Sequence, residues 1–118
     1  MTLALAHITF DCADARVLAN FWSAAIGRPV DDGAEGFFAT IGYPNLGGGP
    51  TWMFIQVPET KSVKNRMHLD LTTDDRAGEV ARLVALGATE VGEHDEWGHQ
   101  WTVMNDPEGN EFCVAAAS

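Results

Sequence analysis

The strongest constraint on the fold is a pattern that occurs twice, once in each half of the chain. The stretches His7 to Asp11 and Met67 to Leu71 both alternate polar and apolar residues, as half-buried strands do. Each stretch leads through a short polar turn into an apolar stripe at helical spacing, and a glycine then ends the stripe, Gly27 in one half and Gly87 in the other. The repetition predicts two copies of one structural module.

Both repeated strands carry a histidine on their polar face. Alternate side chains of a strand point to the same side, so His7 shares a face with Thr9, and His68 shares a face with Asp70. A histidine at the same place in both copies predicts one site to which each half contributes an imidazole.

The remaining pattern predicts a single α+β domain over residues 1–118, with one module at about 5–60 and a second at about 66–116. Strands are expected at 37–41, 51–57, 100–104 and 111–115, with an extended piece beginning at 90. Asp14 is expected to cap the first helix, and Thr73 or Asp74 the second. The order of elements predicts two βαβββ modules in tandem, whose mixed sheets curl around a shared cleft. The segment 42–50 reads as a long loop, with Gly47 to Gly49 as a mobile rim of that cleft.

Composition limits the partners. Of the 118 residues 46% are hydrophobic, and 17 acidic residues against 7 basic ones give a net charge of -10. Such a charge repels nucleic acid and anionic membranes and attracts cationic small molecules. The alternative is that the acidic residues only keep a small protein in solution. No basic leader, membrane-length apolar run or CxxC spacing is present, so we expect a soluble cytoplasmic protein with free thiols.

Several motifs together resemble the vicinal oxygen chelate superfamily, which includes glyoxalase I, extradiol dioxygenases, and the fosfomycin and bleomycin resistance proteins. The motifs are spread over about residues 5 to 116: His7-Ile8-Thr9-Phe10, Phe21-Trp22, His68-Leu69-Asp70-Leu71, Leu86-Gly87-Ala88 and Asp106-Pro107-Glu108-Gly109-Asn110-Glu111-Phe112. More narrowly, the chain is similar to the glyoxalase-like proteins of that superfamily.

The resemblance implies a metal site with one ligand on the first and last strand of each module. The matching positions are His7, Gln56, His68 and Cys113. Glyoxalase-type enzymes usually have glutamates at the second and fourth positions, so the chain departs from the pattern at two of four. We therefore expect no resident cofactor, with zinc or nickel as the open alternative. In the metal-free case the histidines hydrogen-bond in the cleft and Cys113 is a small buried thiol.

Two carboxylates, Asp70 and Glu111, are expected to face the cleft. With His68 and His99 nearby they could carry out acid–base catalysis without a metal. They could equally bind an ammonium or guanidinium group of a ligand, or partner donors of the protein itself.

Aromatic residues give the second group of candidates. Trp52 and Phe54 share one strand face, and Trp97, His99 and Trp101 share another. These aromatic residues are interpreted either as core residues or as the wall of a pocket for a flat organic molecule. The full set expected to bind a ligand is His7, Trp52, Phe54, Gln56, His68, Asp70, Trp101, Glu111 and Cys113.

Two functions are consistent with these features. The first is binding of a small organic ligand, cationic or aromatic, in an aromatic-lined cleft without a complete metal site. The second is a metal-dependent lyase or isomerase of glyoxalase type. A homodimer is expected in both cases, since a chain of this size leaves sheet edges that pairing would cover.

Overall fold

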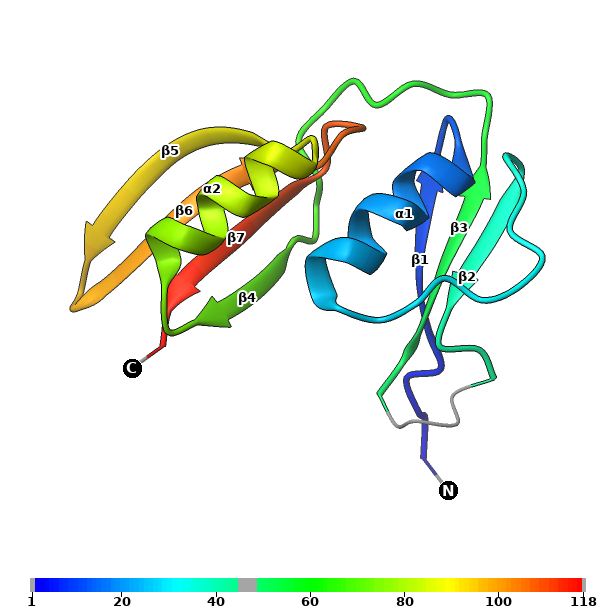
Figure 1. Cartoon of the computed structure of the whole chain (residues 1–118), viewed down its shortest axis with the longest axis horizontal. Coiled ribbons are helices and arrows are strands. Elements are labelled where there is room, and N and C mark those ends of the chain that lie inside the picture. Colours follow the sequence, from blue (N-terminus) through cyan, green and yellow to red (C-terminus); the bar gives the residue numbers. More distant parts are fainter. Residues whose placement is uncertain (1, 45–48, 118) are drawn as a thin grey trace. The chain divides into compact units, whose positions relative to one another are not determined.

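The chain forms two compact units, Met1–Thr60 and Lys61–Ser118 (Figure 1). The structure is a computed structural model that describes residues 2–44 and 49–117. Gly47 and Gly48 of the predicted rim lie outside the described residues. No helix in the described part of the chain combines the length and apolarity needed to cross a bilayer.

The first unit is a three-stranded mixed sheet covered on one face by a helix. Its elements are β1 (His7–Cys12), α1 (Ala15–Ile26), β2 (Phe38–Ile41) and β3 (Thr51–Gln56). The strand order is β1-β3-β2, with β1 parallel and β2 antiparallel to β3. A single antiparallel bridge joins Val30 to Ile41, so the outermost strand of the predicted βαβββ module is reduced here to one residue.

The second unit contains the full module. Its elements are β4 (Leu69–Thr73), α2 (Arg76–Leu86), β5 (Thr89–Glu96), β6 (His99–Asn105) and β7 (Glu111–Ala116). The strand order is β4-β7-β6-β5, with β4 parallel to β7 and the other pairs antiparallel. The two sheets share one connectivity, which confirms the predicted α+β fold of tandem modules.

Local side-chain chemistry fixes the ends of both helices. The Asp14 carboxylate accepts a hydrogen bond from the Val17 N–H, and Gly27 ends α1 in the left-handed conformation with φ 72°. In α2 the cap is Asp75, whose carboxylate accepts from the Gly78 N–H. The prediction of Thr73 or Asp74 is therefore wrong: Thr73 still belongs to β4, and its hydroxyl accepts from the Asp75 N–H.

An aromatic cluster forms the core of the first unit. Phe10 lies with its ring centroid 5.7 Å from that of Trp22, 5.8 Å from Trp52 and 5.3 Å from Phe54. Trp52 and Phe54 are both buried. Register explains this, because Phe54 pairs with Phe10 and therefore points to the face that α1 covers. The prediction that Trp52 and Phe54 line a ligand pocket is wrong for this reason; the alternative interpretation of them as core residues is correct.

Candidate functional site

The candidate site lies on the face of the β4-β7-β6-β5 sheet that α2 does not cover, here called the open face. The helix-covered face holds Phe112 and Val114, both buried. On the open face Asp70 is paired with Cys113, and Cys113 is paired in turn with Val103. One row further along, Ala115 is paired with Trp101. Chemically active and aromatic side chains therefore share one surface.

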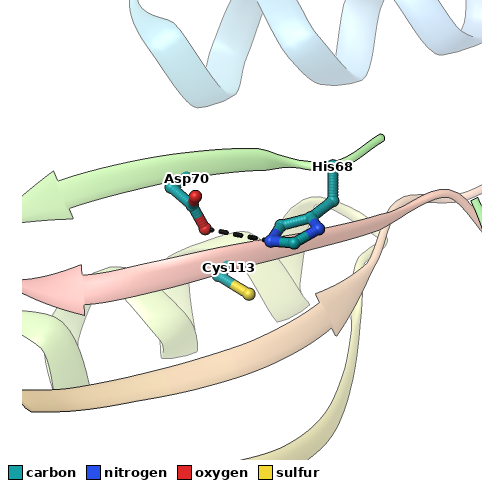
Figure 2. Close-up of side chains that lie close together, drawn as sticks. All are labelled: His68, Asp70 and Cys113. Carbon is teal, nitrogen blue, oxygen red and sulfur yellow. Dashed lines mark ion pairs between the residues drawn. The ribbon is translucent and has the colours of Figure 1, made fainter. Parts of the chain in front are cut away.

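Three side chains of types that can ligate a metal converge on this face, and we call them the β4–β7 cluster. His68 precedes β4 by one residue, Asp70 lies on β4 and Cys113 lies on β7 (Figure 2). The His68 Nε2 atom is 3.3 Å from an Asp70 carboxylate oxygen, and one donor atom from each residue lies within 4.8 Å of the others. The His68 and Asp70 side chains are 42% and 68% exposed, so solvent and ligands reach them.

The thiol of Cys113 is affected by its surroundings. Burial raises the pKa of Cys113, and the negative charge and hydrogen bond of Asp70 raise it further, while the positive charge of Lys64 opposes the shift. The thiol is therefore mostly protonated at neutral pH when no cation is bound.

The four-residue metal set implied by the resemblance does not assemble as predicted. In the first unit Thr9 pairs with Met53 as Asp70 pairs with Cys113 in the second, so Met53 is the counterpart of Cys113. Gln56 pairs instead with the buried Cys12 and donates to the Ala13 carbonyl at 2.9 Å.

The physical reason is a three-residue error in strand register. An odd shift moves every side chain to the opposite face, so Gln56 lies on the face away from His7. Gln56 is removed as a candidate for both the metal set and the ligand set. That His7 and His68 contribute to one site stays a prediction.

Glu111 was expected to be a carboxylate that faces the cleft. In the structure it hydrogen-bonds to the segment that precedes β4. Its carboxylate accepts from Lys61 Nζ at 3.0 Å and from the Asn65 N–H at 2.6 Å, which ties residues 61–65 to β7. Burial alone would raise the pKa of Glu111, but the hydrogen bonds from Asn65 and Lys61 outweigh it and the pKa is lowered overall. Of the roles considered for Glu111, hydrogen bonding to donors of the protein itself is the one that the structure shows.

We expect Glu111→Gln to lower the free energy of unfolding by about 1–2 kcal/mol at pH 7, since two charge-assisted hydrogen bonds are weakened. A carboxyl whose pKa is lower in the folded state stabilises the fold when ionised. That stabilisation is present above the ordinary glutamate range and is lost as the pH falls through the folded value. The difference from the parent protein in urea unfolding should therefore shrink below about pH 4.

The matched control is Glu35→Gln, which weakens the exposed ion pair of Glu35 with Arg16. Exposed pairs contribute roughly 0–1 kcal/mol, so this variant should show a small change in the same titration. Equal losses in the two variants would contradict the structural role of Glu111.

His99 lies away from the β4–β7 cluster. It is the first residue of β6, paired with Glu96 at the tip of the β5–β6 hairpin, and Val103 beside Cys113 is four residues further along. Four residues of strand span roughly 13 Å. The prediction that His99 lies near His68 and assists Asp70 in catalysis is therefore wrong.

The hairpin instead presents three aromatic rings, here called the ring stack. The His94 and Trp101 centroids are 5.1 Å apart at an interplanar angle of 17°, and those of Trp97 and Trp101 are 6.2 Å apart at 11°. Trp101 was a predicted ligand residue, whereas His94 was missed. The signal for His94 is its pairing with Trp101, which becomes visible only once the hairpin register is known.

A hollow of about 560 Å³ lies on the second unit beyond Val103. It is lined in part by Val91, Val103 and Lys64, and also by Glu111, so this predicted cleft carboxylate borders a hollow. Its volume is within the range of roughly 300–1,000 Å³ typical of small-molecule pockets. The open face thus offers an aromatic end, a cluster of metal-ligating groups and a hollow.

Comparison with known proteins agrees with this architecture. The sequence matches the family model of the glyoxalase-like domain over residues 7–115. No match was found among curated protein sequences.

Solved structures show the same fold at low sequence identity. A glyoxalase/bleomycin resistance protein/dioxygenase family enzyme from Burkholderia phytofirmans PsJN is 17% identical with a TM-score of 0.79, covering 98% of this chain and 100% of that chain. A glyoxalase-related enzyme from Fulvimarina pelagi is 18% identical with a TM-score of 0.76, covering 98% and 89%. Fosfomycin resistance protein FosX from Mesorhizobium loti is 15% identical with a TM-score of 0.74, covering 100% and 95%. The chain therefore belongs to the glyoxalase-like domain family, within the vicinal oxygen chelate superfamily.

Proposed function

We propose that this protein binds a flat, positively charged organic molecule on the open face of its second unit. The observation that carries the proposal is the ring stack, in which Trp97 leaves 84% of its surface exposed while it lies nearly parallel to Trp101. An exposed tryptophan held flat against a second one offers a large rigid surface on which an aromatic ligand can stack.

The backbone at Trp97 supports a role in binding. Trp97 and Gly98 form the two-residue turn between Glu96 and His99, and Trp97 has φ 54°. This left-handed conformation is unfavourable for a bulky residue by about 1–2 kcal/mol, and such turns favour Asn or Gly. A strained position occupied by an exposed aromatic residue is typical of a functional surface.

Charge favours a cationic ligand over a neutral one. The chain carries a net charge of -10, and Glu96, which pairs with His99 next to the Trp97 turn, belongs to the open face. A cation over a tryptophan ring gains about 0.5–1 kcal/mol at exposed sites and about 2 kcal/mol when desolvated. The negative charge of Glu96 and the tryptophan rings therefore both act at the hairpin end of the sheet.

Room for the ligand comes from small residues beside the rings. Gly92 lies next to His94 on β5, and a Cβ atom built on it would meet no atom within 4 Å. Ala115 pairs with Trp101 on the other side. The small side chains of Gly92 and Ala115 therefore leave space on the open face beside the ring stack.

The test is a fluorescence titration with three matched heteroaromatic compounds: an N-methylquinolinium cation, the neutral quinoline and a quinoline carboxylate. The cation should quench tryptophan emission with the lowest Kd. Trp97→Ala should weaken its binding about tenfold, which corresponds to about 1.4 kcal/mol of lost stacking and cation–π energy.

Phe37→Ala is the matched control, because Phe37 is an exposed aromatic residue of the first unit. It should leave the Kd unchanged. Preference for the carboxylate would show that Lys64 near the hollow dominates recognition and would overturn the cationic assignment. An equal effect of the two alanine variants would overturn the ring stack as the binding surface.

A second candidate function is a metal-dependent lyase or isomerase of glyoxalase type, and the β4–β7 cluster is the observation that favours it. Turnover of a hemithioacetal that chelation abolishes would support this candidate. Absence of turnover with added zinc or nickel would remove it.

We also propose that the protein is a cytoplasmic homodimer. Strands β4 and β5 are the edges of the second sheet, and such edges are suited to pairing or to cover by a second copy. Sedimentation velocity on the purified protein tests the dimer, and a monomer at micromolar concentration would contradict it.

A further inference from the structure

The β4–β7 cluster brings together three different donor types within one sheet. His68 offers an imidazole nitrogen, Asp70 a carboxylate oxygen and Cys113 a sulfur, and a set of these donor atoms lies within 4.8 Å (Figure 2). Asp70 is absent from the four-position metal set that the resemblance implies, and sequence reasoning assigned it to acid–base chemistry or ligand binding. Its pairing with Cys113 across β4 and β7 brings it beside two other side chains whose donor atoms are able to ligate a metal.

The corresponding positions of the first unit cannot provide the same group. By strand register they are His7, Thr9 and Met53, of which only the histidine is a strong ligand for a divalent ion. The hydroxyl of Thr9 is neutral, and the thioether of Met53 suits Cu(I) rather than Zn²⁺. Both units therefore share the module's connectivity, but only the second unit has all three donors.

We propose that His68, Asp70 and Cys113 form a zinc-type site contained entirely in the second unit, for which His7 is not required. This differs from the shared four-strand site that the resemblance implies, which the register of Gln56 excludes in its predicted form. The site does not depend on the proposed binding of organic cations, since it shares no residue with the ring stack.

The chemistry of the donors selects the metal. An imidazole and a thiolate favour Zn²⁺ over Mg²⁺, Ca²⁺ or Mn²⁺, which prefer all-oxygen sites. Neutral His68 with ionised Asp70 and Cys113 balances a divalent charge. Three protein ligands leave a fourth tetrahedral position, and the exposure of His68 and Asp70 allows water or a ligand atom to fill it.

The geometry requires little rearrangement. With metal–ligand bonds of about 2.0–2.3 Å, neighbouring donors of a tetrahedral zinc site lie roughly 3.3–3.7 Å apart. His68 and Asp70 already meet this spacing at 3.3 Å. The widest separation in the cluster, at most 4.8 Å, closes with a shift of about 1 Å, which side-chain rotation supplies.

The experiment measures metal binding without reference to catalysis. The whole protein is stripped with a chelator, dialysed and titrated with Zn²⁺ by calorimetry, and separately with Co²⁺ while absorption is recorded. We expect one ion per chain and a near-ultraviolet thiolate-to-cobalt charge-transfer band. Cys113→Ser should remove the band. Asp70→Asn and His68→Ala should each weaken binding more than about tenfold, since loss of even an outer-shell partner costs 10–100-fold.

His7→Ala is the control that separates the two arrangements, because His7 occupies the position of His68 in the first unit. It should change the Kd less than twofold, and circular dichroism confirms that each variant is folded. A loss with His7→Ala as large as that with His68→Ala would overturn the single-unit site in favour of a shared one. Unchanged binding in Asp70→Asn, or a cobalt complex without the thiolate band, would also overturn it.

Failure of this site and failure of the proposed ligand binding are distinguishable. Trp97→Ala should leave zinc binding intact, and Cys113→Ser should leave the quinolinium Kd intact. Zinc binding without hemithioacetal turnover would support the site while removing the glyoxalase-type activity.

Discussion

Trp22→Ala is expected to lower the free energy of unfolding by about 3–5 kcal/mol, the range observed for large aromatic residues removed from a core. Trp22 is 0% exposed. Its ring lies 5.7 Å from Phe10, 5.2 Å from Phe21 and 5.4 Å from Trp52 by centroid distance. The substitution leaves a cavity between α1 and the sheet that three rigid rings cannot fill. Because domains are typically stable by about 5–15 kcal/mol, this loss is a large fraction of the total.

Urea unfolding followed by far-ultraviolet circular dichroism measures the change without depending on the tryptophan that is removed. Phe37→Ala is the control, since Phe37 is an aromatic residue of the same unit that is 64% exposed. Its effect should be within about 0.5 kcal/mol. A Trp22→Ala loss below about 1 kcal/mol would mean that α1 does not pack on the sheet as described.

The success of the fold prediction has a local origin. Strand alternation at His7 to Asp11 and the cap at Asp14 act within a few residues of one another, so the sequence pattern contains them directly. The same holds for Gly27, whose left-handed conformation ends α1. Local rules applied twice were sufficient to predict the tandem modules.

The assignment of Gln56 to the metal set was wrong because it depended on pairing between distant strands. The resemblance placed Gln56 and Cys113 at equivalent positions of the two modules, whereas the counterpart of Cys113 is Met53. Nothing within β3 itself indicates which residue pairs with Thr9, and an error of three residues reverses the face. Register of a parallel pair is a long-range property, and a single sequence does not specify it.

Strand β5 shows a second limit of sequence pattern. Its eight residues, Thr89–Glu96, include one large apolar side chain, Val91, so alternation predicts only where the strand begins. The strand forms because β6 supplies its hydrogen-bond partners, with a bulge between Glu90 and Gly92. The ring stack depends on this pairing, and His94 could not be chosen as a site residue without it.

Asp106→Ala is expected to lower the free energy of unfolding by about 3 kcal/mol. Asp106 is 3% exposed, and its carboxylate accepts hydrogen bonds from the Glu108 N–H at 2.9 Å, the Asn110 N–H at 3.0 Å and the Asn110 side-chain amide at 2.9 Å. Alanine removes the acceptor for all three donors. A charge-assisted hydrogen bond contributes about 1.5–3 kcal/mol, and bonds within one network do not add fully.

The Asp106 turn sets the start of β7, so its loss should reach the candidate site. Backbone bonds from Asp106 N–H to Asn110 and from Gly109 N–H to Asp106 close the same turn, and Cys113 follows three residues after Asn110. Asp106→Ala should therefore weaken zinc binding as well as lower stability, whereas Asp32→Ala, an exposed aspartate of the first unit, should change neither. Urea unfolding and the cobalt titration measure the two effects on the same samples. A stable Asp106→Ala protein with intact zinc binding would show that Pro107 and Gly109 suffice to form the turn without the buried carboxylate.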